Sequence, residues 1–395
     1  MSALRETLAV TGMNLRSLPA RYATSLVVIV GIATVVAVLV SVLAMSRGFL
    51  DSMTRTGRPE RVMVIGRGAV VEAAGGFPRD SAITVLGLPG IKKGADGTPI
   101  ASAEYLASVL LPENKDGKDT FITVRGVGPG ALGLRPEMKV VEGRLFKPGL
   151  NEMIAGRSAQ KQVNGVQVGA HIPMQNGDWT ITGIFESNGD SHESEFLTDA
   201  NTLIAAMRRG DSFNSATVWL EDAGSFTTFK DAVSSNPALS VDVKTERDYF
   251  ETAAKPLARI LDVVAYVIGG FMALGAVFGA LNTMYSAISA RKVEIATLRA
   301  LGFGSGPVVV SVFVEAILLA LLGALLGAAV AWLFFDHNLV SLASATNSGQ
   351  QTFTLAVTPG LIVTGIAFAL AIGALGGLFP AVRAARQPVA AALRG

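Results

Sequence analysis

The chain has 395 residues, of which 50% are hydrophobic and only 16% are charged, and its formal net charge is +2. Soluble proteins carry about a quarter charged residues, so the deficit indicates that part of the surface faces lipid. The small net charge, without a long basic run, argues against a nucleic-acid-binding protein. Cysteine is absent, which excludes disulfides and thiolate metal sites.

Four segments have the apolar length that a bilayer crossing needs, about 20 helical residues each. The expected fold class is therefore a membrane α-helical protein, with four transmembrane helices and an α+β extracytoplasmic domain inserted between helices 1 and 2. The first segment is long and lacks an Ala-x-Ala cleavage site, which indicates a signal anchor. Transmembrane helices are predicted at 22–47, 259–287, 307–335 and 359–382. Outside the cytoplasm we expect a domain with a helical stalk at 48–258 and a short loop at 336–358. In the cytoplasm we expect an amphipathic helix at 1–21, a helical loop at 288–306 and a tail at 383–395.

Lysine and arginine residues lie at one side of these spans. Arg16 precedes the first span, Arg291 and Lys292 follow the second, and Arg383 follows the fourth, whereas residues 336–359 contain neither type. Because cytoplasmic loops are enriched in Lys and Arg, both termini and the 291–306 loop are predicted to be cytoplasmic. The chain is thus expected to be a multi-pass membrane protein whose long insert lies outside the cytoplasm.

Glycines recur at four-residue spacing inside the predicted spans. This spacing lets helix backbones approach closely where dispersion drives association. It fits packing within one four-helix bundle, or alternatively a dimer seam. The glycines are Gly275, Gly279, Gly323, Gly327, Gly373 and Gly377.

Glu315 lies within the third predicted span. A charge in the membrane is costly unless it faces the bundle interior or an interface. One interpretation is a structural hydrogen bond to a neighbouring helix. The other is an element that couples nucleotide state to the shape of the bundle.

Residues 48–255 are predicted to form one or two compact α+β units, because strand-like runs alternate with helical stretches. Asp199 is expected to cap a helix over 201–209, and a second helix is expected over 225–235. Residues 245–265 are expected to form a helical stalk that continues into the second span, interrupted only by Pro256. The strand-like runs are 62–65, 121–127, 179–185 and 216–220, and the predicted loops are 87–99 and 126–136.

Possible catalytic and cofactor motifs are weak. Residues 128–133 match G-x-G-x-x-G, but Pro129 and Pro136 indicate a loop and not a dinucleotide site. Residues 189–195 gather carboxylates around His192, and we interpret them as a solvated acidic loop. No G-x-x-x-x-G-K-[ST] motif occurs, so if the protein uses ATP, another chain must hydrolyse it.

Residues 288–302 are the most informative segment. Their composition favours a helix, and Gly302 is a suitable C-terminal stop. Ile295, Leu298 and Leu301 recur every three residues as an apolar stripe, and Arg291, Lys292, Glu294 and Arg299 surround it with charges. Such a helix fits either the membrane surface or a groove on a cytoplasmic partner.

The string at 291–302, Arg-Lys-x-Glu-Ile-x-x-Leu-Arg-Ala-Leu-Gly, resembles the coupling helix of MacB/FtsX-type ABC transporter permeases. Glu315-Ala with Gly323 and Gly327 resembles the third span of that family, and residues 380–394 resemble its C-terminal end. Residues 14–21 resemble its amphipathic first helix. Residues 124–129, 142–146, 169–172 and 181–185 resemble its MacB-type periplasmic core.

The resemblance implies a permease dimer, homo- or heteromeric, bound to two cytoplasmic ATPase subunits that carry ATP and Mg. The chain itself is expected to bind no cofactor and no metal and to have no catalytic residue. Lacking a fused ATPase domain, it is similar to stand-alone permeases such as the lipoprotein-releasing LolC/LolE kind. A periplasmic adaptor and an outer-membrane channel are further possible partners.

By this resemblance the expected function is mechanotransmission, in which ATPase motion rearranges the periplasmic domain and drives export or extraction of a hydrophobic cargo (lipoprotein, lipid, peptide or drug). Two other classes stay open. One is an FtsX-like signal transducer that activates a cell-wall hydrolase. The other is a membrane scaffold without an ATPase partner.

Overall fold

The computed structural model describes residues 3–16, 22–114, 118–174, 177–208, 210–301, 303–343 and 349–386. The chain divides into two compact units. The helical unit comprises Met1–Ser46, Ile260–Asn338 and Leu355–Gly395. The mixed unit comprises Arg47–Arg259 and Leu339–Thr354.

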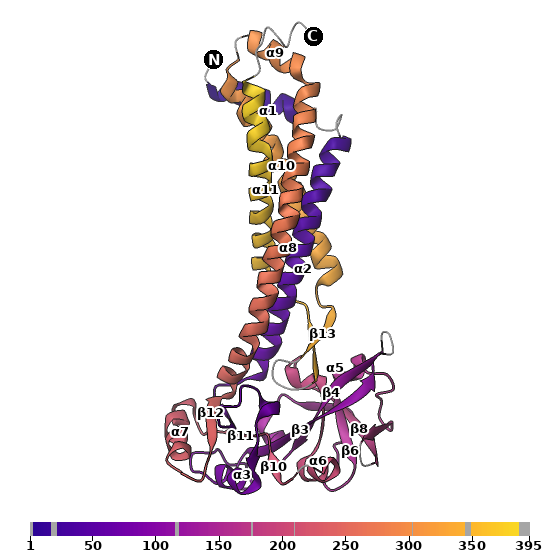
Figure 1. Ribbon diagram of the computed structural model, residues 1–395, viewed down its shortest axis with the longest axis vertical. Helices are drawn as coiled ribbons and strands as arrows, with labels where there is room; N and C mark the ends of the chain where they lie inside the picture. The colour runs from indigo at the N-terminus through magenta and orange to yellow at the C-terminus, as the bar shows by residue number, and fades with distance from the viewer. Residues whose placement is uncertain are drawn as a thin grey trace. The chain divides into compact units, whose positions relative to one another are not determined.

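The helical unit contains four helices that are long and apolar enough to cross a membrane, by length and composition. They lie side by side as a bundle (Figure 1). The last residues of α2 and the first residues of α8 belong to the mixed unit, so two helices run from one unit into the other. The helices are α1 (Ala3–Arg16), α2 (Tyr22–Thr56), α8 (Glu246–Ala290), α9 (Lys292–Ala300), α10 (Ser305–Phe335) and α11 (Pro359–Ala385).

Small side chains let these helices pack closely. Ala320 and Ala324 of α10 and Ala369 of α11 are fully buried in a cluster with Val36 and Leu39 of α2. Alanine favours the helix and leaves room for the branched side chains of α2 opposite. The α8 helix continues through Pro256 as one element of 45 residues.

The mixed unit is built on a ten-stranded sheet with the order β12-β1-β11-β3-β4-β9-β6-β8-β5, and β7 pairs with β8. The β4–β9 and β6–β8 pairs are parallel, and the other described pairs are antiparallel. The strands are β1 (Arg61–Gly66), β3 (Ala101–Pro112), β4 (Asp119–Val127), β5 (Lys139–Gly143), β6 (Glu152–Gly156), β7 (His171–Met174), β8 (Gly177–Glu186), β9 (Glu195–Asp199), β11 (Ser215–Trp219) and β12 (Val241–Thr245); β2 (Phe77–Pro78) and β10 (Ser212–Phe213) form a separate pair.

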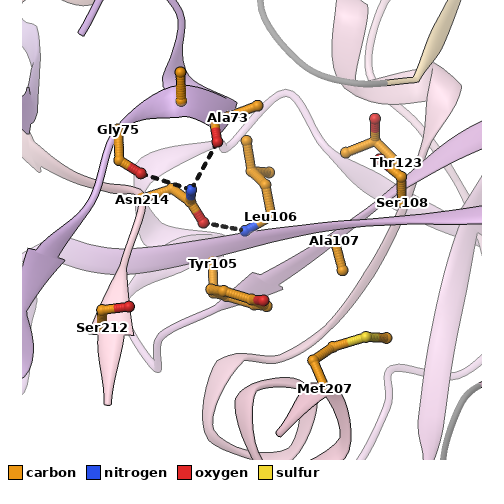
Figure 2. A pocket seen from close by; sticks show the side chains of 11 residues that line it. Ala73, Gly75, Tyr105, Leu106, Ala107, Ser108, Thr123, Met207, Ser212 and Asn214 are labelled. Atoms are coloured by element: carbon orange, nitrogen blue, oxygen red, sulfur yellow. Dashed lines mark hydrogen bonds between the residues drawn. The ribbon is translucent and has the colours of Figure 1, made fainter. Parts of the chain in front are cut away.

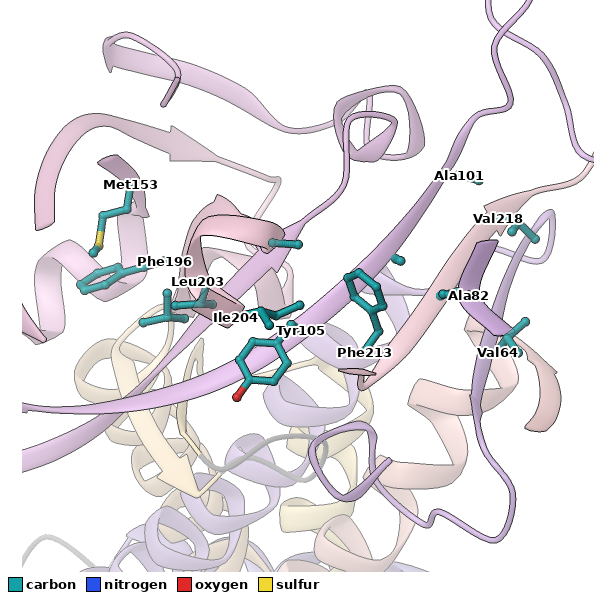
Figure 3. Packing of buried hydrophobic residues seen from close by; sticks show 14 of the residues in the cluster. Val64, Ala82, Ala101, Tyr105, Met153, Phe196, Leu203, Ile204, Phe213 and Val218 are labelled. Carbon is teal, nitrogen blue, oxygen red and sulfur yellow. The ribbon is translucent and has the colours of Figure 1, made fainter. Parts of the chain in front are cut away.

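Short helices cover this sheet. Asp199 caps α6 as predicted, since its Oδ2 accepts a hydrogen bond from the Thr202 amide at 2.8 Å. Leu203 and Ile204 of α6 pack in the core with Tyr105 and Phe196 (Figure 3). The helices are α3 (Arg79–Leu86), α4 (Ala131–Leu134), α5 (Arg157–Gln162), α6 (Ala200–Met207) and α7 (Phe226–Ser234), with 3₁₀ turns η2 (Glu72–Ala74), η3 (Ser191–Ser194) and η4 (Ala223–Ser225).

Two segments predicted as loops contain regular structure. Residues 126–136 include the end of β4 and all of α4. The segment 336–358 contains a hairpin of β13 (Leu339–Ala343) and β14 (Gln350–Thr354), in which Val340 pairs with Phe353. The ring of Phe353 lies edge-on against Phe49 at the end of α2, 5.5 Å between centroids. The hairpin therefore packs within the mixed unit.

Candidate functional site

The helix α9 is separated from α8 by Arg291, whose backbone leaves helical geometry at φ −109° and ψ 14°. The helix predicted over 288–302 is therefore two elements, because residues 288–290 end α8; Gly302 lies outside the described residues. The Arg291 guanidinium holds the Glu294 carboxylate with two hydrogen bonds of 2.8 and 2.9 Å. Such a bidentate, charge-assisted pair fixes the first turn of α9.

One face of α9 packs into the helical unit. Ile295 is buried in a cluster with Met284 of α8 and Val312 of α10. Leu298 is half-buried, and the Arg299 guanidinium donates to the Ala385 carbonyl of α11 at 3.1 Å. These contacts connect α9 to α8, α10 and α11.

The opposite face of α9 is open. Leu301, just past the helix end, is 72% exposed and Val293 is 61% exposed, while Lys292 and Thr297 are also exposed. Val293, Thr297 and Leu301 follow one another at four-residue spacing and so share a face. The predicted apolar stripe is thus split, with its first residue turned inward and its last residue outward.

A chain of polar side chains connects Glu315 to α9. Glu315 is buried in α10, and its Oε2 accepts a hydrogen bond from Asn14 Nδ2 of α1 at 2.7 Å. Asn14 Nδ2 also approaches the Ser311 carbonyl at 3.4 Å, and Asn14 Oδ1 accepts from the Arg291 guanidinium. Arg291 in turn pairs with Glu294. Glu315 therefore makes a hydrogen bond to a neighbouring helix, and that helix links it to α9.

Four of the six predicted glycines pack against neighbouring helices. A Cβ atom on Gly327 would overlap the Ala33 carbonyl of α2, and one on Gly323 would also press on α2. Cβ atoms on Gly373 and Gly377 would overlap alanines of α10. At these positions glycine permits a helix separation that any side chain would widen.

Gly275 and Gly279 of α8 are different. A Cβ atom at either position would meet nothing within 4 Å. Both glycines are exposed, and the exposed Phe271 and Phe278 lie on the same helix. This pair makes no packing contact with the described residues of the chain.

A second polar cluster lies in the mixed unit, around Arg125 of β4. Its guanidinium is buried and contacts three carboxylates: Glu195 at 2.6 Å, Glu72 at 2.7 Å and Glu104 at 2.7 Å. All three carboxylates are buried as well. A buried charge requires such partners, because taking it out of water costs several kcal/mol.

Arg135 and His192 extend this cluster. Arg135 pairs with Glu104 at 2.8 Å and its Nε donates to His192 Nε2 at 3.2 Å. Since arginine is always a donor, His192 Nε2 must accept, and the ring proton belongs on Nδ1, which lies 3.3 Å from Glu195. His192 is thus buried between an arginine and a carboxylate. The prediction of a solvated acidic loop at 189–195 is wrong, because residues 190–195 are buried. Arg125 neutralises Glu195, whereas backbone amides hold the carboxylates of Asp190 and Glu193.

Burial and charge shift the pKa values in opposite directions within this cluster. Burial alone would raise the pKa of Glu104, but Arg135 and Arg125 lower it to about 2. Burial likewise opposes ionisation of Glu195, and Arg125 and His192 keep its pKa well below the usual range. Asp190 has no arginine partner in the described structure, and burial raises its pKa to about 6.

Arg61 forms a neighbouring buried cluster at the start of β1. Its guanidinium contacts Glu246 of α8 at 2.5 Å and Glu137 at 2.7 Å. It also donates to the carbonyls of Thr56, the last residue of α2, and Leu134, at 2.6 and 2.7 Å. One side chain thereby joins α2, α4, α8 and β1.

A cavity of about 500 Å³ opens on the mixed unit beside Tyr105 (Figure 2). Asn214 fixes one wall, since it donates to the carbonyls of Ala73 and Gly75 and accepts from the Leu106 amide. The residues that line the cavity carry no charged side chain. The G-x-G-x-x-G match at 128–133 lies elsewhere and leads into α4, a helix of only four residues.

Two family models match successive parts of the chain. A family model described as MacB-like periplasmic core domain matches residues 23–236. A model described as FtsX-like permease C-terminal matches residues 266–389.

Among curated proteins, the macrolide export ATP-binding/permease protein MacB of Campylobacter jejuni is 23% identical over 93% of this chain. The chain spans 58% of the length of that relative. An uncharacterized ABC transporter permease of Methanocaldococcus jannaschii is 29% identical over 37% of this chain and 36% of its own.

Among solved structures, the periplasmic region of MacB from Actinobacillus actinomycetemcomitans covers 52% of this chain and 96% of its own, with a TM-score of 0.38 and 12% identity. The extracellular domain of the noncanonic ABC-type transporter YknZ from Gram-positive bacteria covers 47% of this chain and 100% of its own, with a TM-score of 0.35 and 16% identity.

Proposed function

Because the chain belongs to the MacB/FtsX-type family of ABC transporter permeases, we propose that it couples ATP hydrolysis in a separate ATPase chain to movement of its mixed unit. In this proposal ATP and Mg bind to the ATPase subunits, and this chain contributes no catalytic residue. The movement drives export or extraction of a cargo, in the manner of mechanotransmission.

We propose that α2, α8, α10 and α11 cross the inner (plasma) membrane, with both termini and α9 in the cytoplasm and the mixed unit in the periplasm. The apolar length of these helices supports the crossings. The orientation is supported by Arg16, Lys292 and Arg383, which lie near the ends of α1, α9 and α11.

The observation that carries the coupling proposal is the contact chain from α9 to Glu315. The open face of α9, with Val293 and Leu301, is available for an ATPase. Its inner face packs against α8 and α10, and Arg291 and Asn14 connect it to Glu315. A displacement of α9 would therefore be transmitted to α1, α8 and α10 through these existing contacts.

The cargo and further partners belong to the proposal as well. Relatives named for macrolide export support a hydrophobic or amphiphilic cargo, which includes drugs, lipids, peptides and lipoproteins. We propose that two permease chains pair, as homo- or heterodimer, through the α8 face that carries Gly275 and Gly279. A periplasmic adaptor and an outer-membrane channel are the expected companions in a cell with two membranes.

The test is purification of the full chain from its host in mild detergent, with identification of retained proteins. We expect a stoichiometric ATPase subunit, and we expect Leu301→Asp to remove at least about nine-tenths of it, since a charge in an apolar groove costs about 1–3 kcal/mol or more. Val70→Asp is the control, because Val70 is similarly exposed but lies in the mixed unit. If no ATPase is retained, or if both variants lose it equally, α9 is not the docking element.

A further inference from the structure

Residues 187–195, here called the junction segment, connect β8 to β9 and are buried except at Asn188 and Gly189. Its 3₁₀ turn η3 is capped by Asp190, whose Oδ1 accepts from the His192 amide at 3.0 Å. Glu193 Oε1 accepts from the amides of Ser187 and Gly189 at 2.6 and 2.7 Å. Every residue of η3 is buried. A polar loop this deeply buried must be held by specific partners.

The first partner is the end of α2. The Thr56 hydroxyl accepts a hydrogen bond from the Ser191 amide at 2.9 Å and lies 3.0 Å from the Ser191 hydroxyl. One turn earlier, the Ser52 hydroxyl lies 3.4 Å from the Gly189 carbonyl. The last turns of α2 therefore sit directly on the junction segment.

The second partner is the β13–β14 hairpin. The Ser194 hydroxyl accepts from the Thr352 amide at 2.9 Å and donates to the Thr352 carbonyl at 3.2 Å. Gln351 reaches the Ser52 hydroxyl at 3.4 Å, so the hairpin and α2 also touch each other there.

The third partner is the beginning of α8. The His192 ring meets the Phe250 ring edge-on, with 6.3 Å between centroids. Tyr249 beside it is buried, and its hydroxyl accepts from the amide of Glu72, which is a carboxylate partner of Arg125.

The junction segment also ends in the sheet. Glu195 is the first residue of β9, pairs in parallel register with Thr123 of β4, and holds Arg125 through two hydrogen bonds of 2.6 and 3.0 Å. On its other side the junction segment packs tightly against β6, since a Cβ atom on Gly156 would overlap the Glu193 backbone. A displacement of the segment cannot be absorbed locally and must move the strands.

We propose that the junction segment is the element that transmits movement of α2, α8 and the β13–β14 hairpin to the central sheet, with Thr56 and Ser194 as its positioning residues. This inference rests on the proposed function for the origin of the movement. The three elements are the only links through which the described chain passes between the helical and mixed units, and all three contact this one segment. Transmission follows because each contact is direct and buried.

The first experiment needs no ATPase. Hydrogen–deuterium exchange of the full chain in nanodiscs compares Thr56→Val, which removes the acceptor of the Ser191 amide, with Thr56→Ser, which keeps it. Thr54→Val is the matched control, because within the described residues the Thr54 hydroxyl donates only to the Leu50 and Asp51 carbonyls of its own helix.

We expect Thr56→Val to accelerate exchange roughly tenfold or more in residues 187–195 and also in β9 and β14, since a buried group loses its partner. Thr56→Ser and Thr54→Val are expected to match the wild type. Acceleration confined to the end of α2, or equal acceleration in Thr54→Val, overturns the proposal.

The second experiment adds the co-purified ATPase with ATP and vanadate. We expect nucleotide to change exchange in β9 of the wild type, and we expect Thr56→Val to lose that change while its ATP hydrolysis rate stays the same. A nucleotide response in β9 that survives in Thr56→Val rejects the junction segment as transmitter. If no ATPase is retained, the proposed function fails, and the nucleotide-free comparison still decides whether the segment connects the three elements.

Discussion

The buried polar clusters around Glu315 and around Arg125 differ in how they balance charge. In the helical unit, the neutral amide of Asn14 links the carboxylate of Glu315 to the guanidinium of Arg291. In the mixed unit, Arg125 alone contacts three carboxylates. The first cluster uses few charges because each one is costly among apolar helices. The second can be dense because its charges solvate one another.

This difference predicts which cluster tolerates change. When one cation is the partner of three anions, its removal leaves all three without that partner. When a neutral amide links two charged groups, most of the hydrogen bonds remain after one charge is removed. The substitutions below test that contrast, and the largest effect is expected first.

Arg125→Leu is expected to destabilise the mixed unit by about 3–5 kcal/mol, because Glu72, Glu104 and Glu195 lose a shared buried partner. Urea unfolding followed by limited proteolysis of the full chain measures the loss. Arg144→Leu is the control: its pair with Glu152 is half exposed, and its removal should cost less than about 1 kcal/mol. Equal effects of the two variants would contradict the assigned burial.

Gly327→Val is expected to destabilise the helical unit by about 1–3 kcal/mol, since the added side chain would overlap the α2 backbone. Thermal unfolding in detergent measures this. Gly279→Val should leave the fold of a single chain unchanged, because its Cβ meets nothing within 4 Å. If α8 forms the dimer seam, Gly279→Val lowers the dimer fraction in cross-linking; an unchanged dimer fraction assigns the seam elsewhere.

Asp190→Asn is expected to stabilise the mixed unit by about 1–2 kcal/mol at pH 7. Burial raises the pKa of Asp190 from 3.8 to about 6, so the folded state binds its proton more tightly than the unfolded chain. The stability from Asp190 is therefore complete below pH about 4 and is lost as the pH rises through about 6.

Denaturation of the wild type and Asp190→Asn across this pH range provides the measurement. The difference between them should be largest above pH 6 and vanish below pH about 4. A difference that is independent of pH would show that hydrogen bonds to Ser187 and His192, and not the charge, decide the effect.

Glu315→Gln is expected to have the smallest effect on stability, below about 1 kcal/mol, because a glutamine oxygen still accepts from Asn14. Retention of the ATPase should be normal, while nucleotide-driven exchange changes in the mixed unit should weaken. Unchanged coupling together with normal assembly would leave Glu315 with a structural role only.

The two clusters also differ in how visible they are in the sequence. Glu315 stands alone in an apolar run, so its position within a span and its need for a partner were predictable from the sequence. His192 and its neighbouring carboxylates lie in a polar stretch, where exposure is the ordinary expectation. His192 and Glu195 are buried against Arg135 and Arg125, which come from other elements of the fold.

Local sequence patterns predicted which strands and caps form better than they predicted the tertiary contacts of those elements. The predicted strands at 62–65, 121–127 and 179–185 lie in β1, β4 and β8. The helix cap at Asp199 was predictable because aspartate is a preferred N-cap residue and stands directly before the helical stretch. The β13–β14 hairpin was missed because each strand has only five residues and β14 is mostly polar. What stabilises it is contact with the junction segment and α2, which no local pattern encodes.

Pro256 gives α8 an uneven stiffness. Its ring removes the amide hydrogen that the carbonyl of Thr252 would otherwise accept, although the helix continues on both sides. That turn has one fewer backbone hydrogen bond along the helix axis than its neighbours, so the helix bends there more easily than it shortens. A rod with such a compliant point conveys push and pull along its length while it lets the two ends change direction independently.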